Sequence, residues 1–581
     1  MKSNRVLTPR PVFWSSLSLA SVLMVLVSLS AAACVSTYTH NATDETSKTS
    51  SGQSQSKSSD RKPAPPSALL NTDYVRPTGR TISVSGAGDA AARAFQNALD
   101  SARSGDVIAI EPGSTITGNF VLPARKDTGW TVIRSAAGDD KLPPVGSRAR
   151  PADASVMPKL VTPNADPVIR TAPGAHHYRF IGIEFTVAPA WAQNHGLILL
   201  GDGGNAQTSP DSIPHNLIID RCFIHGNAEV NLRRGIALNS ATTAVIDSYI
   251  SDVHEAGAES QAICGWNGPG PFKIVNNHLE GAGENVMFGG ADPHVRNLVP
   301  SDIEFRGNYC TKPLSWMRQH PTFAGKRWSV KNIFELKNAR RVLIDGNLFE
   351  NNWVDGQSGF AILFTVRNQE GSAPWSVVED ITFTNNVVRH IAAAINFLGR
   401  DDNNKSEQVK RVLIRNNLFD DVGGKQWGSN GRFLQIVETE DVTVDHNTIF
   451  HTGNVITAYG SASLGFVFTN NIVPHNEYGV MGDGASVGNS TLDRYFPGVV
   501  FRKNVIAGGR NSLYPSENFF PAAIDEARFA DRAGGSYLLG NSSPYRGAGT
   551  DGKNIGCDID ALKPAFDSAA RSRAANSVLT D

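Results

Sequence analysis

The chain has 581 residues, with 54 basic and 55 acidic side chains and a formal net charge of -1 at pH 7. A chain with this balance has no overall positive charge that would attract nucleic acids or anionic membranes, so neither is an expected partner of the protein surface. Hydrophobic residues make up 40% of the chain and charged residues 19%, which is typical of a folded protein and excludes a disordered whole.

The first 33 residues are organised like a secretory signal. Lys2, Arg5 and Arg10 precede an apolar stretch at 17–33 that ends in small residues. We therefore expect residues 1–33 to be removed and the protein to be exported, to the periplasm, the outside or the cell envelope.

The junction after this segment leaves two alternatives open. The run Ala31-Ala32-Ala33-Cys34 resembles a lipoprotein box, in which Cys34 would be acylated, but it also permits plain cleavage after the Ala-x-Ala pattern. A lipid anchor at Cys34 is the one membrane attachment that we expect. Residues 34–70 are rich in Ser, Thr, Lys and Gln and then in Pro, and predict a disordered tether.

A glycine-rich run at 86–91 imitates a dinucleotide-binding fingerprint, because Glu111 stands at the end of the next predicted strand. A Rossmann domain needs further alternation of strands and helices, whereas this chain continues into strand repeats. No nucleotide cofactor is therefore expected. Residues 90–103 have apolar side chains near helical spacing and predict an amphipathic helix.

From about residue 176 one phrase recurs: an apolar alternation, a polar pair, an Asn and a second apolar alternation. Alternating apolarity predicts strands, and Asn tolerates the left-handed conformation of a tight corner. The clearest copies are FKIVNNHLE (272–280), DIEFRGNYC (302–310), RVLIDGNLFE (341–350), DITFTNNVVR (380–389), RVLIRNNLFD (411–420), DVTVDHNTIF (441–450), GFVFTNNIV (465–473) and GVVFRKNVI (498–506).

The spacing of the repeated Asn is short and irregular. Asn447 is followed by Asn471 after one short repeat, whereas Asn308 is followed by Asn347 after a longer one. Solenoids allow such variable insertions, since only the strands must stack. An Asn at every corner can also hydrogen-bond the coils on both sides and form a ladder.

A third short apolar run precedes each copy and completes a coil of three strands. These runs are GLILLG (196–201), GIALNS (235–240), AICGWN (262–267), NVMFGG (285–290), NIFELKN (332–338), AILFTV (361–366), AINFLG (394–399), FLQIVE (433–438) and VITAYG (455–460).

With three strands per coil, the chain resembles the pectin/pectate-lyase-like superfamily of right-handed parallel β-helices. The resemblance implies an all-β, three-sheeted parallel β-helix over residues 71–510, with the helix at 90–103 as its N-terminal cap. It also implies an irregular C-terminal capping tail at 511–581 and a polysaccharide as the partner.

The run NIFELKN places chemically useful side chains on the outer face of the coil. If Phe334 and Leu336 point inward, Glu335 and Lys337 point to solvent side by side. Coils stack about 4.8 Å apart, so polar residues of successive coils form a continuous strip. The strip is expected to include Glu284, Asp292, Lys331, Arg367, Asn368, Asn396, Arg400 and Gln435.

Long loops flank the same coils and would turn the strip into a groove. Trp316 and Trp353 lie in these loops, where their rings would stack on sugars. The expected ligand is an acidic polysaccharide, with Asn396, Gln435 and Lys331 among its contacts.

The first functional hypothesis is a lyase that cleaves a uronate-containing glycan by β-elimination. Such a reaction needs a base for the proton α to the carboxyl group and a cation for the developing charge, roles that Lys337 and Arg367 can fill beside Glu335. Alternatively, Ca²⁺ held by Glu284, Asp292 and Glu335 would bridge the substrate carboxylate.

Two further hypotheses use the same scaffold. A glycoside hydrolase needs two carboxylic acids across the scissile bond, and Glu284, Glu335 and Asp401 are the candidates. A non-catalytic glycan-binding or adhesive surface protein needs only the groove, because fold alone does not determine function.

Overall fold

The structure, a computed structural model, describes residues 62–189, 192–428 and 430–576. The predicted secretory signal, Cys34 and most of the predicted tether lie outside these residues. Within the described residues, no helix is both long and apolar enough to cross a membrane.

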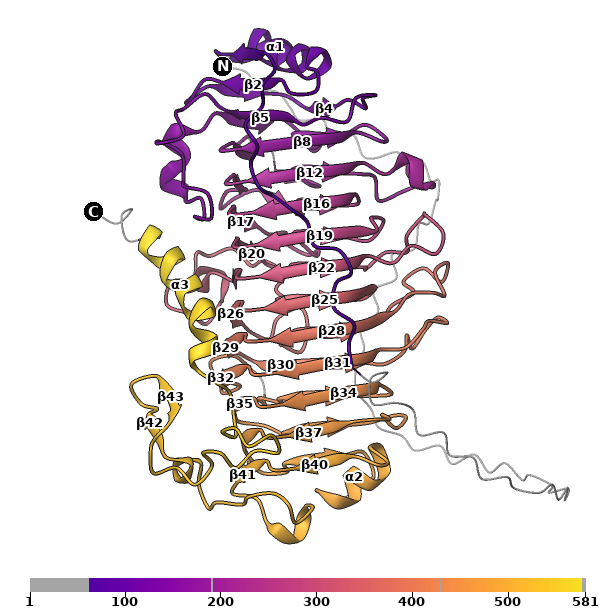
Figure 1. Cartoon of the computed structure of the whole chain (residues 1–581), viewed down its shortest axis with the longest axis vertical. Coiled ribbons are helices and arrows are strands. Elements are labelled where there is room, and N and C mark those ends of the chain that lie inside the picture. The colour runs from indigo at the N-terminus through magenta and orange to yellow at the C-terminus, as the bar shows by residue number, and fades with distance from the viewer. Residues whose placement is uncertain (1–61, 190–191, 429, 577–581) are drawn as a thin grey trace, which may run out of the picture. The chain divides into compact units, whose positions relative to one another are not determined.

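Three long parallel sheets of 14, 13 and 12 strands make up the body of the protein. Each coil of the chain contributes one strand to each sheet in turn, so strands that are neighbours in a sheet come from successive coils (Figure 1). The predicted right-handed, three-sheeted parallel β-helix is confirmed. Sheet A runs from β1 (Thr81–Val84) to β40 (Val500–Arg502), sheet B from β3 (Thr115–Thr117) to β41 (Val505–Ala507), and sheet C from β4 (Phe120–Leu122) to β39 (Val480–Gly482).

One coil shows how the repeat folds. The phrase RVLIDGNLFE forms β25 (Ala339–Asp345) in sheet A and β26 (Leu348–Asn352) in sheet B, and the next apolar run forms β27 (Phe360–Thr365) in sheet C. The corner between β25 and β26 holds Gly346 at φ 65 and the fully buried Asn347.

The corner asparagines form the predicted ladder. The side-chain amide of Asn347 donates to Asn386 Oδ1 at 3.0 Å and to the carbonyl of Phe305 at 3.0 Å, and its backbone N–H donates to the same Asn386 Oδ1 at 2.9 Å. Each rung thus satisfies buried polar groups of two coils, which a folded chain must do at every turn. Equivalent bonds link Asn277, Asn308, Asn417, Asn447, Asn471 and Asn504.

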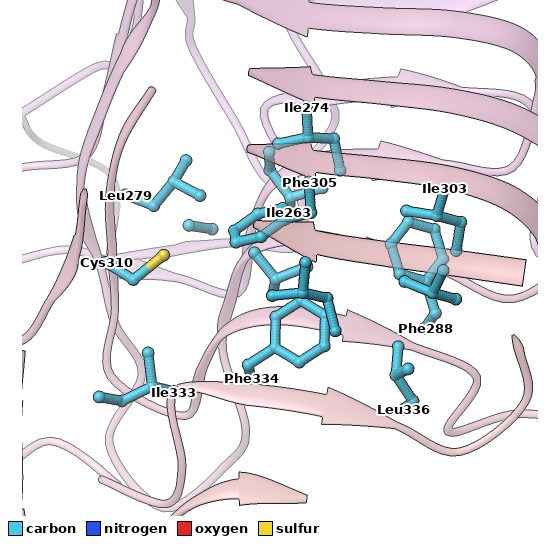
Figure 2. Close-up of a cluster of buried hydrophobic side chains, with 14 of the residues drawn as sticks. Ile263, Ile274, Leu279, Phe288, Ile303, Phe305, Cys310, Ile333, Phe334 and Leu336 are labelled. Carbon is cyan, nitrogen blue, oxygen red and sulfur yellow. The ribbon is translucent and has the colours of Figure 1, made fainter. Parts of the chain in front are cut away.

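The interior of the coils is filled by apolar side chains from all three sheets (Figure 2). Phe305 and Phe334 face each other with ring centroids 5.2 Å apart, and Cys310 lies among them as a fully buried free thiol. Because Phe334 and Leu336 are both fully buried in this core, the residues between and after them on the strand face outward.

The two ends of the chain pack differently. Helix α1 (Gly88–Ser101) lies at the N-terminal end of the coils and packs Phe95 against Phe120, with ring centroids 4.8 Å apart. At the C-terminal end, α3 (Lys563–Asn576) runs back along sheet B (Figure 1). Leu562 and Ala565 pack there against the outward apolar side chains of sheet B.

Residues 62–78, which we call the N-terminal strap, cross the outside of sheet A (Figure 1). The strap is fixed by side chains of successive coils: the backbone N–H of Ala64 donates to Asp380, that of Ser67 donates to Asp302, and Lys273 donates to the carbonyl of Leu70. From residue 62 onward the predicted tether is therefore held against the β-helix. Sheets A and B carry the strap and α3, and long loops border sheet C.

Candidate functional site

The outward face of sheet C carries one row of side chains in register. The row begins at Glu335 on β24 (Phe334–Leu336), whose register partner on the next coil is Leu363. On the coils after that, the same register position holds Asn396 on β30 (Ala393–Leu398), Gln435 on β33 (Leu434–Ile436) and Thr457 on β36 (Ile456–Ala458). Parallel stacking therefore brings together residues that are far apart in the sequence.

Glu335 faces outward, but the prediction that it points to solvent is wrong. The residue is 2% exposed, because neighbouring side chains and loops cover its carboxylate. Thr365 donates to one oxygen at 3.2 Å and Asn332 to the other at 3.3 Å, and the Lys337 ammonium lies 3.7 Å from the first oxygen. Glu335 and Lys337 thus form a covered pair.

Lys331 is the centre of a second set of charges beside this pair. Its ammonium contacts the carboxylate of Glu259 and lies 3.1 Å from that of Glu284, which is fully buried. Gln261 donates to the other oxygen of Glu284 at 2.8 Å. We call Glu259, Glu284, Lys331, Glu335 and Lys337 the ionic cluster.

Burial and charge act in opposite directions within the ionic cluster. Burial alone would lower the pKa of Lys331, but Glu284 and Glu259 raise it well above its usual range, so the ammonium stays protonated. Burial raises the pKa of Glu284 although Lys331 opposes that shift, whereas Lys331 keeps the pKa of Glu259 low against its own burial. The cluster therefore holds a permanent cation beside a carboxyl group that protonates easily.

A cavity of about 270 Å³ opens beside Lys337, on the coils that precede it. Gly289 and Gly290, at φ 91 and 89, keep it open: a Cβ on Gly289 would lie 2.9 Å from the Cβ of Lys337, and one on Gly290 would lie 2.8 Å from the side chain of Met287. The cavity is lined by Arg233, Arg234, Ala258, Glu259, Gln261, Trp266, Met287, Gly289, Gly290 and Ala291.

On the other side of Lys337, a chain of hydrogen bonds continues along the row. Gln435 donates to Asn396 at 3.0 Å and accepts from Arg432 at 2.6 Å, and Tyr459 also hydrogen-bonds Gln435. A second cavity, of about 780 Å³, begins at Arg432 and is lined by Lys425, Asn430, Asn454, Glu477, Tyr478 and Met481 among others. The predicted residues Asn396 and Gln435 are thus brought together.

The loop residues of the predicted strip have other partners. Arg367 donates its backbone N–H to the carbonyl of Lys337 at 2.9 Å, but its guanidinium pairs with Asp401 at 3.1 Å and with Asp402. Asn368 is 1% exposed and bonds the backbone of its own and a neighbouring loop, and Arg400 pairs with Glu438 at 3.3 Å. Arg367 therefore lies next to Lys337 but is held by carboxylates.

Trp316 and Trp353 are buried, with 6% and 3% of their surfaces exposed. They pack with Trp328, Trp427 and other apolar side chains at the corner between sheets B and C. Their rings therefore anchor the covering loops, and the sequence-based expectation of sugar stacking gains no support from this placement.

Two of the carboxylates proposed for calcium, Glu284 and Asp292, lie at opposite ends of the same strand. Glu284 begins β21 (Glu284–Phe288) and contacts Lys331 and Gln261, whereas Asp292 follows the other end of that strand and accepts from Ser372 at 2.7 and 2.8 Å. Across the part of the chain that the structure describes, no group of three His, Cys, Asp or Glu side chains is placed to hold a metal ion.

Several site residues escaped the sequence analysis. Arg234 and Gln261 stand in register with the predicted Glu284, at the start of β15 (Arg234–Leu238), β18 (Gln261–Gly265) and β21, where outward residues also form a row. Aligning the first residue of each apolar run would have found them. Glu259 and Arg432 lie in the loops before their strands, and the repeat gives no signal for them.

Comparisons with known proteins give fold-level likenesses. No family model and no curated protein sequence matches the chain. Among solved structures, it is similar to the PL6 family alginate lyase AlyGC, at 12% identity and TM-score 0.45, over 75% of this chain and 53% of that one. It is also similar to a GH87 α-1,3-glucanase from Streptomyces thermodiastaticus, at 14% identity and TM-score 0.48, over 75% and 70%.

A third similar structure is a tailspike protein of an E. coli bacteriophage in complex with a hexasaccharide, at 13% identity and TM-score 0.42, over 72% of this chain and 62% of that one. The chain thus spans about half the length of the alginate lyase and about two thirds of the other two. The fold assignment rests on the strand order described above and not on these matches.

Proposed function

We propose that the protein is a polysaccharide lyase that cleaves a uronate-containing glycan by β-elimination on the outer face of sheet C. The observation that carries the proposal is the contrast between two neighbouring lysines. Lys331 is held protonated between two carboxylates, whereas Lys337 has one carboxylate at 3.7 Å and lies against Gly289, which lines a cavity.

In this proposal Lys337 takes the proton from the carbon α to the uronate carboxyl group. The electron pair left on carbon forms the new C=C bond as the bond to the leaving glycosidic oxygen breaks, and the proton carried by Lys337 is available to that oxygen. Arg367, on the next coil, stabilises the charge that develops on the carboxylate.

A glycoside hydrolase is the second candidate, and one observation favours it. Burial raises the pKa of Glu284, as a general acid requires, and the carboxylate of Glu335 lies close enough to contribute to that shift. In that mechanism Lys337 would bind the substrate and would not act as a base.

The test is to incubate the purified protein with a panel of uronate polysaccharides and to follow two signals separately. A lyase produces unsaturated ends that absorb in the ultraviolet together with new reducing ends, and a hydrolase produces reducing ends alone. Glycan binding with neither signal would contradict both and indicate an adhesive protein. We also propose export, on the basis of the signal predicted at 1–33, with Cys34 as the candidate anchor.

A further inference from the structure

The cavity beside Lys337 has the two-sided character of a sugar-binding subsite. Its floor is apolar, because Met287 packs with Ala237, Cys264 and the ring of Trp266 on the outer face of sheet C. Its other side carries Arg234 and Gln261. A pocket with one apolar wall and a few placed polar groups suits a ring that has an apolar face and polar edges.

The charges around the cavity leave one cation for a ligand. Arg233 forms two hydrogen bonds with Glu255, at 2.8 and 2.7 Å, and Glu259 is paired with Lys331. Arg234, in contrast, forms no ion pair within 4 Å among the described residues, although it is near enough to Glu259 to help lower the pKa of that carboxyl group. Its guanidinium lies 5.1 Å from the centroid of the Trp266 ring, and its neighbouring acceptor is the thiol of Cys264, a weak one. The Nε of Arg234 is buried and finds no acceptor among the described residues.

A second polar group of the cavity is also incomplete. Gln261 is 2% exposed and donates to Glu284, but its buried Oε1 has no donor within the described residues. Buried polar atoms without partners are rare in folded proteins, and a ligand group is one way to complete them. Here the missing partners are an anion for Arg234 and a hydroxyl donor for Gln261.

We infer that this cavity is a subsite for a second carboxylate-bearing sugar of the glycan, which Arg234 binds through the carboxylate and Gln261 through a hydroxyl group. The inference rests on the proposed function of the same face. Gly289 and Gly290 line the cavity and lie against Lys337, so a sugar in the subsite would lie next to the one whose proton Lys337 removes. The substrate class is then a glycan with uronates at neighbouring positions, and isolated uronates in a neutral chain are poor substrates.

The experiment compares Arg234→Gln with the unchanged protein, both in a Lys337→Met background that prevents turnover. The probes are an oligouronate and the same oligosaccharide with its carboxyl groups reduced to alcohols, and the measurement is Kd by calorimetry. We expect Arg234→Gln to weaken oligouronate binding roughly tenfold or more, as loss of a hydrogen bond to a charged group does, and to leave binding of the reduced probe unchanged. In the active protein the same substitution should raise KM much more than it lowers kcat.

Arg306→Gln is the matched control, since Arg306 is a half-exposed arginine on sheet A that pairs with Asp345 at 3.2 Å. It should change neither Kd nor KM. Unchanged oligouronate binding in Arg234→Gln would overturn the subsite, and so would an equal loss for both probes. If the protein yields no cleavage product but Arg234→Gln still weakens oligouronate binding selectively, the lyase proposal fails and the subsite stands.

Discussion

Sheets A and C are built from the same repeat, but the charged side chains on their outer faces are paired differently. On sheet A, charges close in pairs between successive coils: Arg341 bonds Asp302 at 2.7 and 2.8 Å, and Arg411 bonds Asp380 at 2.7 and 2.8 Å. The strap then adds donors from its own backbone to both aspartates. Every carboxylate of this set has a matched cation.

On sheet C the charges are shared unevenly. Lys331 pairs with both Glu259 and Glu284, while Arg234 forms no close ion pair with a carboxylate among the described residues. Among the described residues, the buried side-chain oxygens of Asn332 and Gln261 have no hydrogen-bond donor. Closed pairs tie coils together, whereas an open network costs stability and is the kind of arrangement that a bound ligand completes.

The largest expected effect comes from Lys337→Met. Loss of the base should lower the rate of β-elimination by about 10²–10⁴-fold, and it should also lower the free energy of unfolding because the buried Glu335 loses its cation. Lys273→Met is the control on sheet A, because among the described residues Lys273 donates only to the strap, at Leu70 and Thr72. It should reduce stability and leave the rate intact. A Lys337→Met protein that keeps its full rate would refute the assigned base.

Lys331→Met should lower the free energy of unfolding by about 3 kcal/mol, because it leaves two carboxylates without their shared cation. The loss should depend on pH. Lys331 lowers the pKa of Glu259 in the folded protein, so the stability from this pair is present above the ordinary pKa of Glu and absent at acid pH. The variant is therefore least destabilised at acid pH and loses more stability as pH rises through the ordinary range of Glu.

Chemical denaturation of Lys331→Met at several pH values measures this dependence. Adding Glu284→Gln should recover part of the stability at neutral pH, since it removes one of the unpaired charges. A pH-independent loss, or no recovery in the double variant, would contradict the shared-cation arrangement.

Asp302→Asn tests the closed pairs of sheet A. Burial opposes ionisation of Asp302, yet the hydrogen bonds from Arg341 and Ser67 bring its pKa down to about 2. Its contribution is therefore fully present above the usual pKa of Asp and disappears as pH falls through about 2. We expect the variant to lose about 2 kcal/mol of unfolding free energy at neutral pH, with unchanged activity. A difference from the unchanged protein that persists at the lowest pH would argue against the ion pair as its cause.

Much of the fold could be predicted from the sequence because the repeat is local. Each copy carries its own alternation and its corner Asn, so Asn347 and Asn386 define two coils without reference to the rest of the chain. The path of α3 could not be predicted in this way. It packs on Leu348 and Val387, outward residues of sheet B that look like any other strand positions in the sequence.

The site was only partly predictable, for the same reason. The alternation around Phe334 and Leu336 placed Glu335 on the correct face, and the stacking placed Asn396 and Gln435 in its row. The repeat does not predict which loops cover that row of side chains. The loop that carries Trp316 and Lys331 is an insertion, and its packing buries the cluster and brings Lys331 to Glu259 and Glu284.

The smallest expected effect is that of metal removal, which separates the ionic cluster from a calcium site. Chelation should leave the rate of β-elimination unchanged, because Glu284 and Glu335 already bind the side chains of Lys331, Gln261, Thr365 and Asn332. Lys331→Met should differ, since it frees two carboxylates, which are hard oxygen ligands. Ca²⁺ should therefore raise the Tm of Lys331→Met and not that of the unchanged protein. A chelator-sensitive rate that Ca²⁺ restores in the unchanged protein would show that a metal, and not Lys331 alone, supplies positive charge on this face.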